Sequence, residues 1–343
     1  MKSTRCGLDI AKRVFQVHGV DEDGAAKVRK TLRRAQVLQF FAQLEPCVVG
    51  IEACGGAHYW ARELSKFGHT VKLMAGQFVS AYRKSGKNDA NDAEAICEAV
   101  GRPNMRFVAV KTEEQQAVLM WHRARTMTVA NRAAQVNQIR GLLAEFGVVV
   151  PLGVDRLRRE LPDILADAEN GLPTLARQLL DDLLGQLRFF DGQLEYYDQQ
   201  IAEFARASEA AQRLMEIEGI GPLTATALVA SVGDARVFES GRQFAAWLGL
   251  TPRQHSTGGK ARLGKMSKRG DRYLRTLLVH GSRTLLYYSA RKNDAKSVWA
   301  TRAMQRRHVN VVAVALAAKQ ARTIWALLAR GTRYQPPAAA QAA

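Results

Sequence analysis

The segment Cys47-Val48-Val49-Gly50-Ile51-Glu52 decides the fold class, because it is a compact apolar run that ends on an acid. Such a run predicts a strand. Further strands are predicted at residues 5–10, 14–20, 25–29 and 70–74, and helices at 35–44 and 57–67. A meander followed by strands that alternate with helices predicts a mixed α/β sheet covered by helices.

The remainder of the chain has a mainly helical pattern. Apolar residues at helical spacing run from Thr112 to Phe146 and again over 174–206, which predicts two long helices. These helices are expected to form a hairpin or coiled coil with each other or with another subunit. The expected domains are an α/β domain at 1–110, a helical coiled-coil segment at 111–210, a helical C-terminal domain at 211–332 and a disordered tail at 333–343.

The composition indicates a nucleic-acid partner. The 343 residues include 50 Lys and Arg against 32 Asp and Glu, so a polyanion is favoured over an acidic protein as the large partner. The longest uncharged stretches are shorter than a membrane span, and the first residues lack the apolar core of a signal peptide. We therefore expect a cytoplasmic protein without a membrane partner.

The sequence disfavours several cofactors. The four cysteines, at positions 6, 47, 54 and 97, form no C-x-x-C pair, and the seven histidines show no H-x-x-x-H spacing. Both observations argue against zinc, and the cysteine pattern also argues against a disulfide framework. Neither of the glycine-rich phosphate-binding motifs is present, so use of ATP or NAD is disfavoured as well.

Four carboxylates could meet at one edge of the predicted sheet. Asp9 lies in the first strand, Glu52 ends a later strand, and Asp89 and Asp92 share one face of a helix. Carboxylate oxygens favour Mg²⁺ or Mn²⁺, which act in pairs in phosphodiester chemistry. By themselves Asp89 and Asp92 are more typical of acids that interact with a helix dipole. Asp9 strengthens the metal hypothesis, because an acid inside an apolar strand needs a partner.

Two features predict contact with nucleic acid. Residues 217–228 are similar to a helix-hairpin-helix, in which Gly219 and Gly221 would let backbone amides bind a phosphate, although a plain helix corner explains the glycines equally well. Residues 251–307 hold fifteen Lys and Arg against two acids, with aromatic residues between them, which fits phosphate neutralisation and base stacking. The basic residues expected to bind nucleic acid are Arg253, Lys260, Arg262, Lys265, Lys268, Arg269 and Arg272.

The order of these motifs resembles the DEDD transposases of the insertion-sequence 110 family, in the 1111 subgroup, and the related Piv invertases. The resemblance spans about residues 5–330. It rests on the motifs at 7–12 (Gly-Leu-Asp-Ile-Ala-Lys), 50–53 (Gly-Ile-Glu-Ala), 87–93 (Lys-Asn-Asp-Ala-Asn-Asp-Ala), 217–221, 249–253 and 265–271. It implies a RuvC-like (ribonuclease H-like) N-terminal domain, a helical coiled-coil segment and a C-terminal transposase domain.

The resemblance also implies a chemistry. It makes Asp9, Glu52, Asp89 and Asp92 the ligands of Mg²⁺, or of Mn²⁺, and it makes a serine the nucleophile that joins DNA covalently. The family further implies a noncoding guide RNA, donor and target DNA, and a homo-oligomer, either a dimer or a tetramer.

The nucleophile can be placed at either of two adjacent hydroxyls. Counting forward from Arg253 favours Thr257, and counting back from Lys268 favours Ser256. We take Ser256 as the nucleophile, because the family chemistry is attributed to serine, and keep Thr257 as the alternative. The segment carries no dedicated general base, and taken alone it is more typical of a loop.

The favoured hypothesis is therefore a DNA recombinase that acts through a covalent seryl-DNA intermediate. A first rival is a nuclease selective for Holliday-junction-type structures, in which the same carboxylates activate water. A second rival is a nucleic-acid-binding protein without catalytic activity, in which the acids are structural.

Overall fold

The structure is a computed structural model that describes residues 3–84, 86, 88–260 and 262–336. It divides into two compact units, Met1–Glu113 and Glu114–Ala343. Each unit is described by itself. The domain boundaries expected near residues 110 and 210 stay predictions, and residues 337–343 of the expected disordered tail lie outside the described residues.

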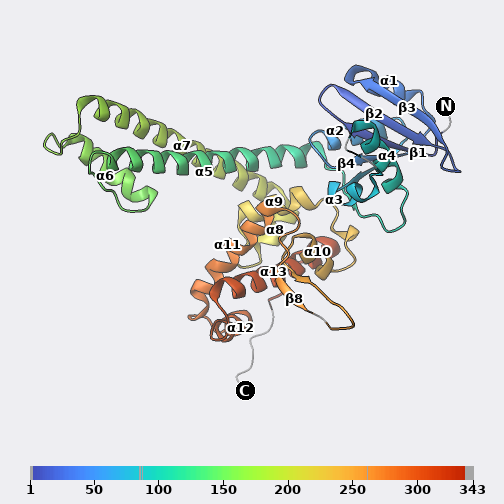
Figure 1. Ribbon diagram of the computed structural model, residues 1–343. Coiled ribbons are helices and arrows are strands. Elements are labelled where there is room, and N and C mark those ends of the chain that lie inside the picture. Colours follow the sequence, from blue (N-terminus) through green and yellow to red (C-terminus); the bar gives the residue numbers. More distant parts are fainter. Residues whose placement is uncertain (1–2, 85, 87, 261, 337–343) are drawn as a thin grey trace. The chain divides into compact units, whose positions relative to one another are not determined.

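The first unit is built on a six-stranded mixed sheet (Figure 1). The strand order is β3-β2-β1-β4-β5-β6; β1 pairs in parallel with β4 and β4 with β5, and the other pairs are antiparallel. The strands are β1 (Arg5–Ile10), β2 (Val14–Val20), β3 (Ala26–Arg33), β4 (Val48–Glu52), β5 (Thr70–Met74) and β6 (Phe107–Val108). The helices are η1 (Arg34–Gln36), α1 (Val37–Ala42), α2 (Ala57–Ser65), α3 (Gly76–Val79), η2 (Ser80–Tyr82) and α4 (Asp89–Val100).

Helices cover both faces of this sheet. On one face, side chains of β1 to β4 form an apolar core with α1 and α2, in which Phe15 packs edge-on against Trp60 at 5.0 Å between ring centroids. On the other face, α4 packs through Ile96 and Val100 over Met74. Strand β4 is apolar along its length because both of its faces are covered, as is usual for parallel strands. The predicted mixed α/β sheet is thus confirmed.

Two glycines let α4 lie very close to the sheet. Gly7 and Gly50 are direct partners in the β1–β4 pairing. A Cβ atom on Gly7 would lie 2.1 Å from the backbone oxygen of Ala93, and one on Gly50 would lie 2.8 Å from Val100 Cβ. Only residues without a side chain fit beneath the helix at these two positions. The glycine pair therefore fixes where the first turn of α4 lies relative to the ends of β1 and β4.

The second unit begins with two long helices that run side by side (Figure 1). They are α5 (Glu113–Ala144), whose first residue belongs to the first unit, and α7 (Thr174–Ala207), with α6 (Val154–Ala166) between them. Ion pairs join α5 to α7, from Arg125 to Asp198 at 2.5 Å and from Arg132 to Asp191 at 2.6 Å. The two long helices were predicted within a few residues, α6 was missed, and an intersubunit coiled coil stays a prediction.

The C-terminal part of this unit is a helical core with one β-hairpin. The helices are α8 (Glu209–Met215), α9 (Pro222–Val232), η3 (Ala235–Val237), α10 (Gly241–Trp247), α11 (Arg272–Ser289), α12 (Ala295–Met304) and α13 (Val309–Arg330), and the hairpin strands are β7 (Pro252–Gln254) and β8 (Leu263–Met266). Buried His122 of α5 ties that helix to this core, with Nδ1 2.9 Å from Tyr273 Oη and Nε2 3.0 Å from Thr226 Oγ1. Burial lowers the pKa of His122 to about 4, so the imidazole is neutral at pH 7.

Helix α13 is long and apolar enough to cross a membrane by length and composition alone. It packs against α10 and α11, and Leu316, Ala317 and Ile324 are buried in the cores of the second unit. Core helices of folded domains often reach this hydropathy when neighbouring helices surround them. We assign α13 to the core of the second unit.

Candidate active site

Asp9 and Glu52 lie at the same edge of the sheet and on the same face. Side chains alternate along a strand, so Asp9 shares the face of Gly7 and Glu52 shares the face of Gly50, which is the face that α4 covers. Because β1 and β4 are parallel, their carboxyl ends meet at one edge. Both side chains are half-buried.

Helix α4 brings Asp89 and Asp92 to this edge. Its N-cap is Asn88, whose Oδ1 accepts a hydrogen bond from the backbone N–H of Asn91 at 2.8 Å, so the helix begins at the first acid. Asp89 is exposed and Asp92 half-buried in the first turn. Both acids therefore also interact favourably with the positive end of the helix dipole. Lys87 of the predicted motif lies outside the described residues.

The four carboxylates are close enough to influence one another. Burial is the largest cause that raises the pKa of Asp9 to about 6, and the charges of Asp89, Asp92 and Glu52 contribute to the same shift, in that order. This combination is what clustered acids produce when their charge is not fully compensated. The structure thus brings together all four carboxylates that the sequence nominated.

Two residues that the sequence did not nominate also contact this cluster. Arg83 donates from Nε to Asp92 Oδ1 at 2.5 Å and so compensates one of the four charges. Gly76 lies against Glu52, because a Cβ atom there would be 2.5 Å from Oε1. Gly76 is the first residue of α3, directly after β5. Because β5 is the neighbour of β4, this place in the sequence was a signal for a contact with the end of β4. The contact of Arg83 with Asp92 depends on tertiary packing, which the sequence pattern does not predict.

The donor set suits a hard divalent cation, but its present spacing is wider than that of metal ligands. Within the described residues, no three His, Cys, Asp or Glu side chains are arranged so that they could hold a metal ion. Carboxylates whose mutual repulsion raises a pKa are the groups whose charge Mg²⁺ would neutralise.

Ser256 and Thr257 lie in the second unit, on the β7–β8 hairpin. Thr257 and Lys260 form a bridge around Gly258 and Gly259, whose φ angles of +56° and +76° are typical of a tight hairpin turn. Ser256 is exposed and its Oγ accepts a hydrogen bond from Gln254 Nε2 at 2.8 Å. The sequence of this segment by itself favours a loop. The Gly-Gly pair was the signal for a hairpin, and Ala261 lies outside the described residues.

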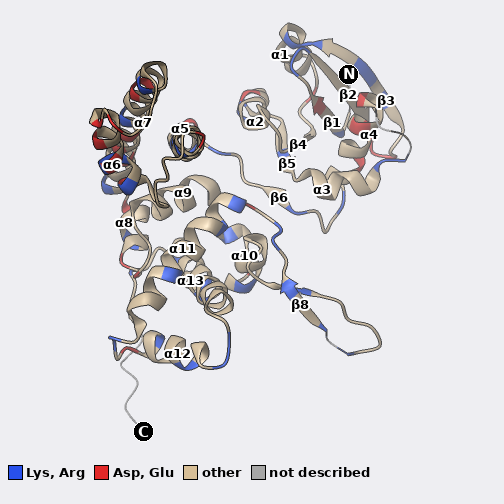
Figure 2. Cartoon of the chain, turned by 60° about the vertical axis from the view of Figure 1, so that its left-hand side comes forward, with Lys and Arg blue, Asp and Glu red and all other residues tan. Residues whose placement is uncertain are grey.

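The seven predicted basic residues are all exposed, on the hairpin, on the turn before α11 and at the first residue of α11. Figure 2 shows basic residues along this part of the chain, near the label of β8. In the described part of the chain none of the seven forms an ion pair, so their charges are available to an anion. Lys268 has a φ angle of +55°, a strained conformation for a lysine that warrants a functional hypothesis. By contrast, Arg275 is buried and donates to backbone oxygens such as Leu248 O at 3.1 Å, so it contributes structure rather than surface charge.

The two glycines of the α8–α9 corner differ in their surroundings. Gly219 has a φ angle of +82° and packs against α11, where a Cβ atom would lie 2.9 Å from Gly281 O. Its identity is explained by this close approach. Gly221 is the exposed N-cap of α9, and a Cβ atom there would meet nothing within 4 Å. The helix-hairpin-helix role of both residues stays a prediction.

Comparison with known proteins places the chain in a family. Residues 211–299 match the model described as Transposase IS116/IS110/IS902 family, and residues 6–148 match a DEDD-type model described as a transposase. A "Probable family 20 transposase" of Pseudomonas aeruginosa is 53% identical, over 98% of this chain and 100% of that protein. The chain belongs to the IS110 family of transposases.

The relatives of this transposase also fit the predicted subgroup. The "Transposase for insertion sequence element IS1111A" of Coxiella burnetii is 44% identical, over 96% of this chain and 90% of that protein. The "Transposase for insertion sequence element IS1328" of Yersinia enterocolitica is 41% identical, over 96% of this chain and 98% of that protein. The transposase is therefore an insertion-sequence enzyme that cuts and recombines DNA, and its mixed sheet is consistent with a ribonuclease H-like domain.

Proposed function

We propose that the chain cuts and rejoins DNA through a covalent seryl-DNA intermediate, at a centre formed by Asp9, Glu52, Asp89 and Asp92. The observation that supports this most is the convergence of these acids from two strands and one helix. We assign Mg²⁺, or Mn²⁺, to these four carboxylates. When bound, the ions stabilise negative charge on the oxygens of the reacting phosphodiester.

In this proposal Ser256 is the nucleophile, with Thr257 as the alternative. Ser256 Oγ forms a bond to phosphorus while the bond from phosphorus to one deoxyribose oxygen breaks. The seryl proton leaves, and the released oxygen takes up a proton. A hydroxyl of the second strand then attacks the seryl phosphate ester, which restores the serine and seals the DNA. The exposure of Ser256 at a hairpin supports this assignment, because a nucleophile must reach its phosphate.

The basic hairpin and the turn before α11 are proposed to hold the nucleic acid. Exposed and unpaired arginines and lysines bind phosphates without reading bases, which suits a division of labour in which a noncoding guide RNA selects donor and target DNA. We place Gly221 at the open start of α9 among these phosphate contacts, with Gly219 shaping the corner. A dimer or tetramer in the bacterial cytoplasm would join the two DNA sites.

Trapping the covalent adduct tests the proposal. The chain is incubated with Mg²⁺, its element's end DNA and RNA from that end, then denatured, and DNA-linked peptides are mapped. We expect DNA on Ser256 in the parent protein and in the Thr257→Ala variant, and no adduct in Ser256→Ala. DNA on Thr257 would reverse the assignment. Strand cleavage without any adduct would favour the water-activating nuclease, and neither adduct nor cleavage would favour the non-catalytic binding protein.

A further inference from the structure

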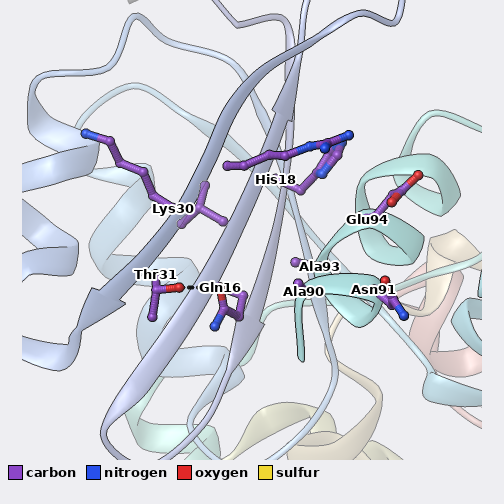
Figure 3. A pocket seen from close by; sticks show the side chains of 10 residues that line it. Gln16, His18, Lys30, Thr31, Ala90, Asn91, Ala93 and Glu94 are labelled. Carbon is purple, nitrogen blue, oxygen red and sulfur yellow. Dashed lines mark hydrogen bonds between the residues drawn. The ribbon is translucent and has the colours of Figure 1, made fainter. Parts of the chain in front are cut away.

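A polar cavity lies beside the carboxylate cluster in the first unit. It has a volume of about 280 Å³ and is bounded by β2, β3 and the first turns of α4 (Figure 3). Its polar side chains come from Gln16, His18, Arg29, Thr31, Asn91 and Glu94. None of the four carboxylates lines it, so it is distinct from the proposed metal centre.

The register of the sheet places this cavity next to the proposed reaction site. Gln16 is the direct partner of Asp9 across the β1–β2 pair, so the two side chains are neighbours on the face that α4 covers. On α4, Asn91 and Glu94 flank Asp92 in the sequence. Any group held in the cavity would therefore lie one strand away from Asp9.

The lining carries hydrogen-bonding groups of the kind that recognise a nucleobase. Thr31 Oγ1 donates a hydrogen bond to Gln16 Oε1 at 2.9 Å (Figure 3). This bond fixes the orientation of the Gln16 amide, so that its Nε2 donors point away from Thr31. Buried His18 faces Glu94, and burial lowers the pKa of its imidazole, so the ring is a neutral donor and acceptor at pH 7. Carboxamides are the side chains that pair with the edge of a base in two places.

The charge of the cavity suits a phosphate at its rim. Glu94 is neutralised by Lys84 Nζ at 2.7 Å. Exposed Arg29 forms no ion pair among the described residues, so its charge is available. Lys30 also borders the cavity, but its side chain extends to the opposite face, where Nζ lies 5.3 Å from the centre of the Phe40 ring. Because Lys84 neutralises Glu94 and Arg29 adds one positive charge, the net charge of these side chains is positive.

We propose that this cavity binds a single unpaired nucleotide of the DNA strand adjacent to the reacting phosphodiester, with its base against Gln16 and His18 and its phosphate against Arg29. This inference rests on the proposed function, because it takes the carboxylate cluster as the reaction site. The volume is near the lower limit of about 300 Å³ for small-molecule pockets, which leaves room for one base and excludes a base pair. A base must leave its stack to enter, and the contacts inside repay that cost of a few kcal/mol.

Photo-crosslinking tests the pocket without knowledge of the target sequence. The full chain is mixed with random-sequence DNA in which 5-iododeoxyuridine replaces thymidine, irradiated and digested, and the crosslinked peptides are identified. We expect crosslinks in the peptide that contains His18. Thr31→Trp should fill the cavity from β3 and reduce these crosslinks about tenfold or more. Thr70→Trp is the matched control, since Thr70 is also an exposed strand threonine but does not line the cavity.

A second variant and a parallel assay distinguish failure of the pocket from failure of the proposed function. Gln16→Leu keeps the size of the side chain and removes its hydrogen bonds, so it should also reduce the crosslinks while leaving the fold intact. Crosslinks that are absent from β2, β3 and α4, or unchanged in both variants, would overturn the inference. Strand transfer by the same protein is measured in parallel with Mg²⁺, the element's end DNA and RNA from that end, and with all four carboxylates intact. Strand transfer without these crosslinks would remove only the pocket. Crosslinks without strand transfer would remove the proposed function and leave only nucleotide binding by the cavity.

Discussion

The carboxylate cluster and the hydroxyl-bearing hairpin are positioned in opposite ways. Asp9 is the second-last residue of β1 and Glu52 the last residue of β4, beneath a helix that packs on two glycines, so their positions follow from the core of the first unit. Ser256 projects from a hairpin whose β7 residues are all exposed and which pairs through a few backbone hydrogen bonds. The difference teaches that packing fixes the carboxylates that we propose to stabilise charge, whereas the hydroxyl that we propose as the nucleophile lies on an exposed hairpin with little packing to hold it.

The largest effect is expected from removing one acid of the fixed cluster. Asp89→Asn and Asp92→Asn should each reduce strand transfer about 10³-fold, which corresponds to roughly 4 kcal/mol of lost charge stabilisation. Glu98→Gln on the same helix is the control, because among the described residues Glu98 forms its ion pair with surface Arg102. Joint molecules separated on denaturing gels measure the effect. Parental activity in both Asn variants would remove these acids from the reaction site.

A smaller effect is expected from the packing that positions those acids. Gly7→Ala should lower the free energy of unfolding by about 1–3 kcal/mol, because the added methyl group meets the backbone of α4. Gly55→Ala is the matched control, since a Cβ atom there meets nothing within 4 Å. Urea denaturation of the full chain measures both variants. Equal midpoints for the two would show that α4 can move aside, and that packing does not fix the cluster.

The exposed basic surface should respond through salt dependence. Replacing Lys265, Lys268 and Arg269 together with alanine should make the plot of log affinity against log salt shallower by about 0.9 for each duplex phosphate that the variant no longer neutralises. Fluorescence anisotropy with random-sequence DNA at several salt concentrations measures the slope. Arg236→Ala removes one arginine that is already paired with Asp234 and should leave the slope unchanged. Parallel slopes for the triple variant and the parent would mean that these side chains are merely solvated.

The smallest effect concerns the pH dependence of stability without metal. Asp9 has a pKa of about 6 in the fold, above its ordinary value of 3.8, so the folded state holds this proton more tightly than the unfolded chain does. The stabilisation from this group is complete below pH 3.8 and is lost as the pH rises toward 6. Asp9→Asn should therefore unfold at higher urea concentration than the parent at pH 7, and the difference should disappear near pH 4. A difference that is constant with pH would exclude Asp9 as its source.

The sequence was sufficient for those parts of the molecule that follow from apolar periodicity. The strand at 48–52 and the two long helices were predicted, because burial leaves a repeating apolar pattern. The four acids were nominated because they interrupt that pattern or begin a helix, and their role in the reaction stays a prediction. The hairpin at 252–266 was not predicted, because every residue of its strands except half-buried Met266 is exposed and no such pattern results. Helix α6 was not predicted either, because it contains Pro162, a residue that is unusual inside a helix. The Arg83 contact with Asp92 joins the end of η2 to the start of α4, nine residues further on, and depends on how these successive helices pack.

The glycine pair beneath α4 also predicts which changes this site could tolerate through compensation. The atoms that exclude a side chain at Gly50 belong to Val100, Met74 and Ile96, so a smaller residue at one of those positions could make room for an alanine. The atoms that exclude one at Gly7 are the backbone oxygen of Ala93 and the backbone nitrogen of Cys97, which no substitution can shrink. A designer who repacks this domain could therefore replace Gly50 with a partner mutation, but would have to move the whole helix, and its two acids, to replace Gly7.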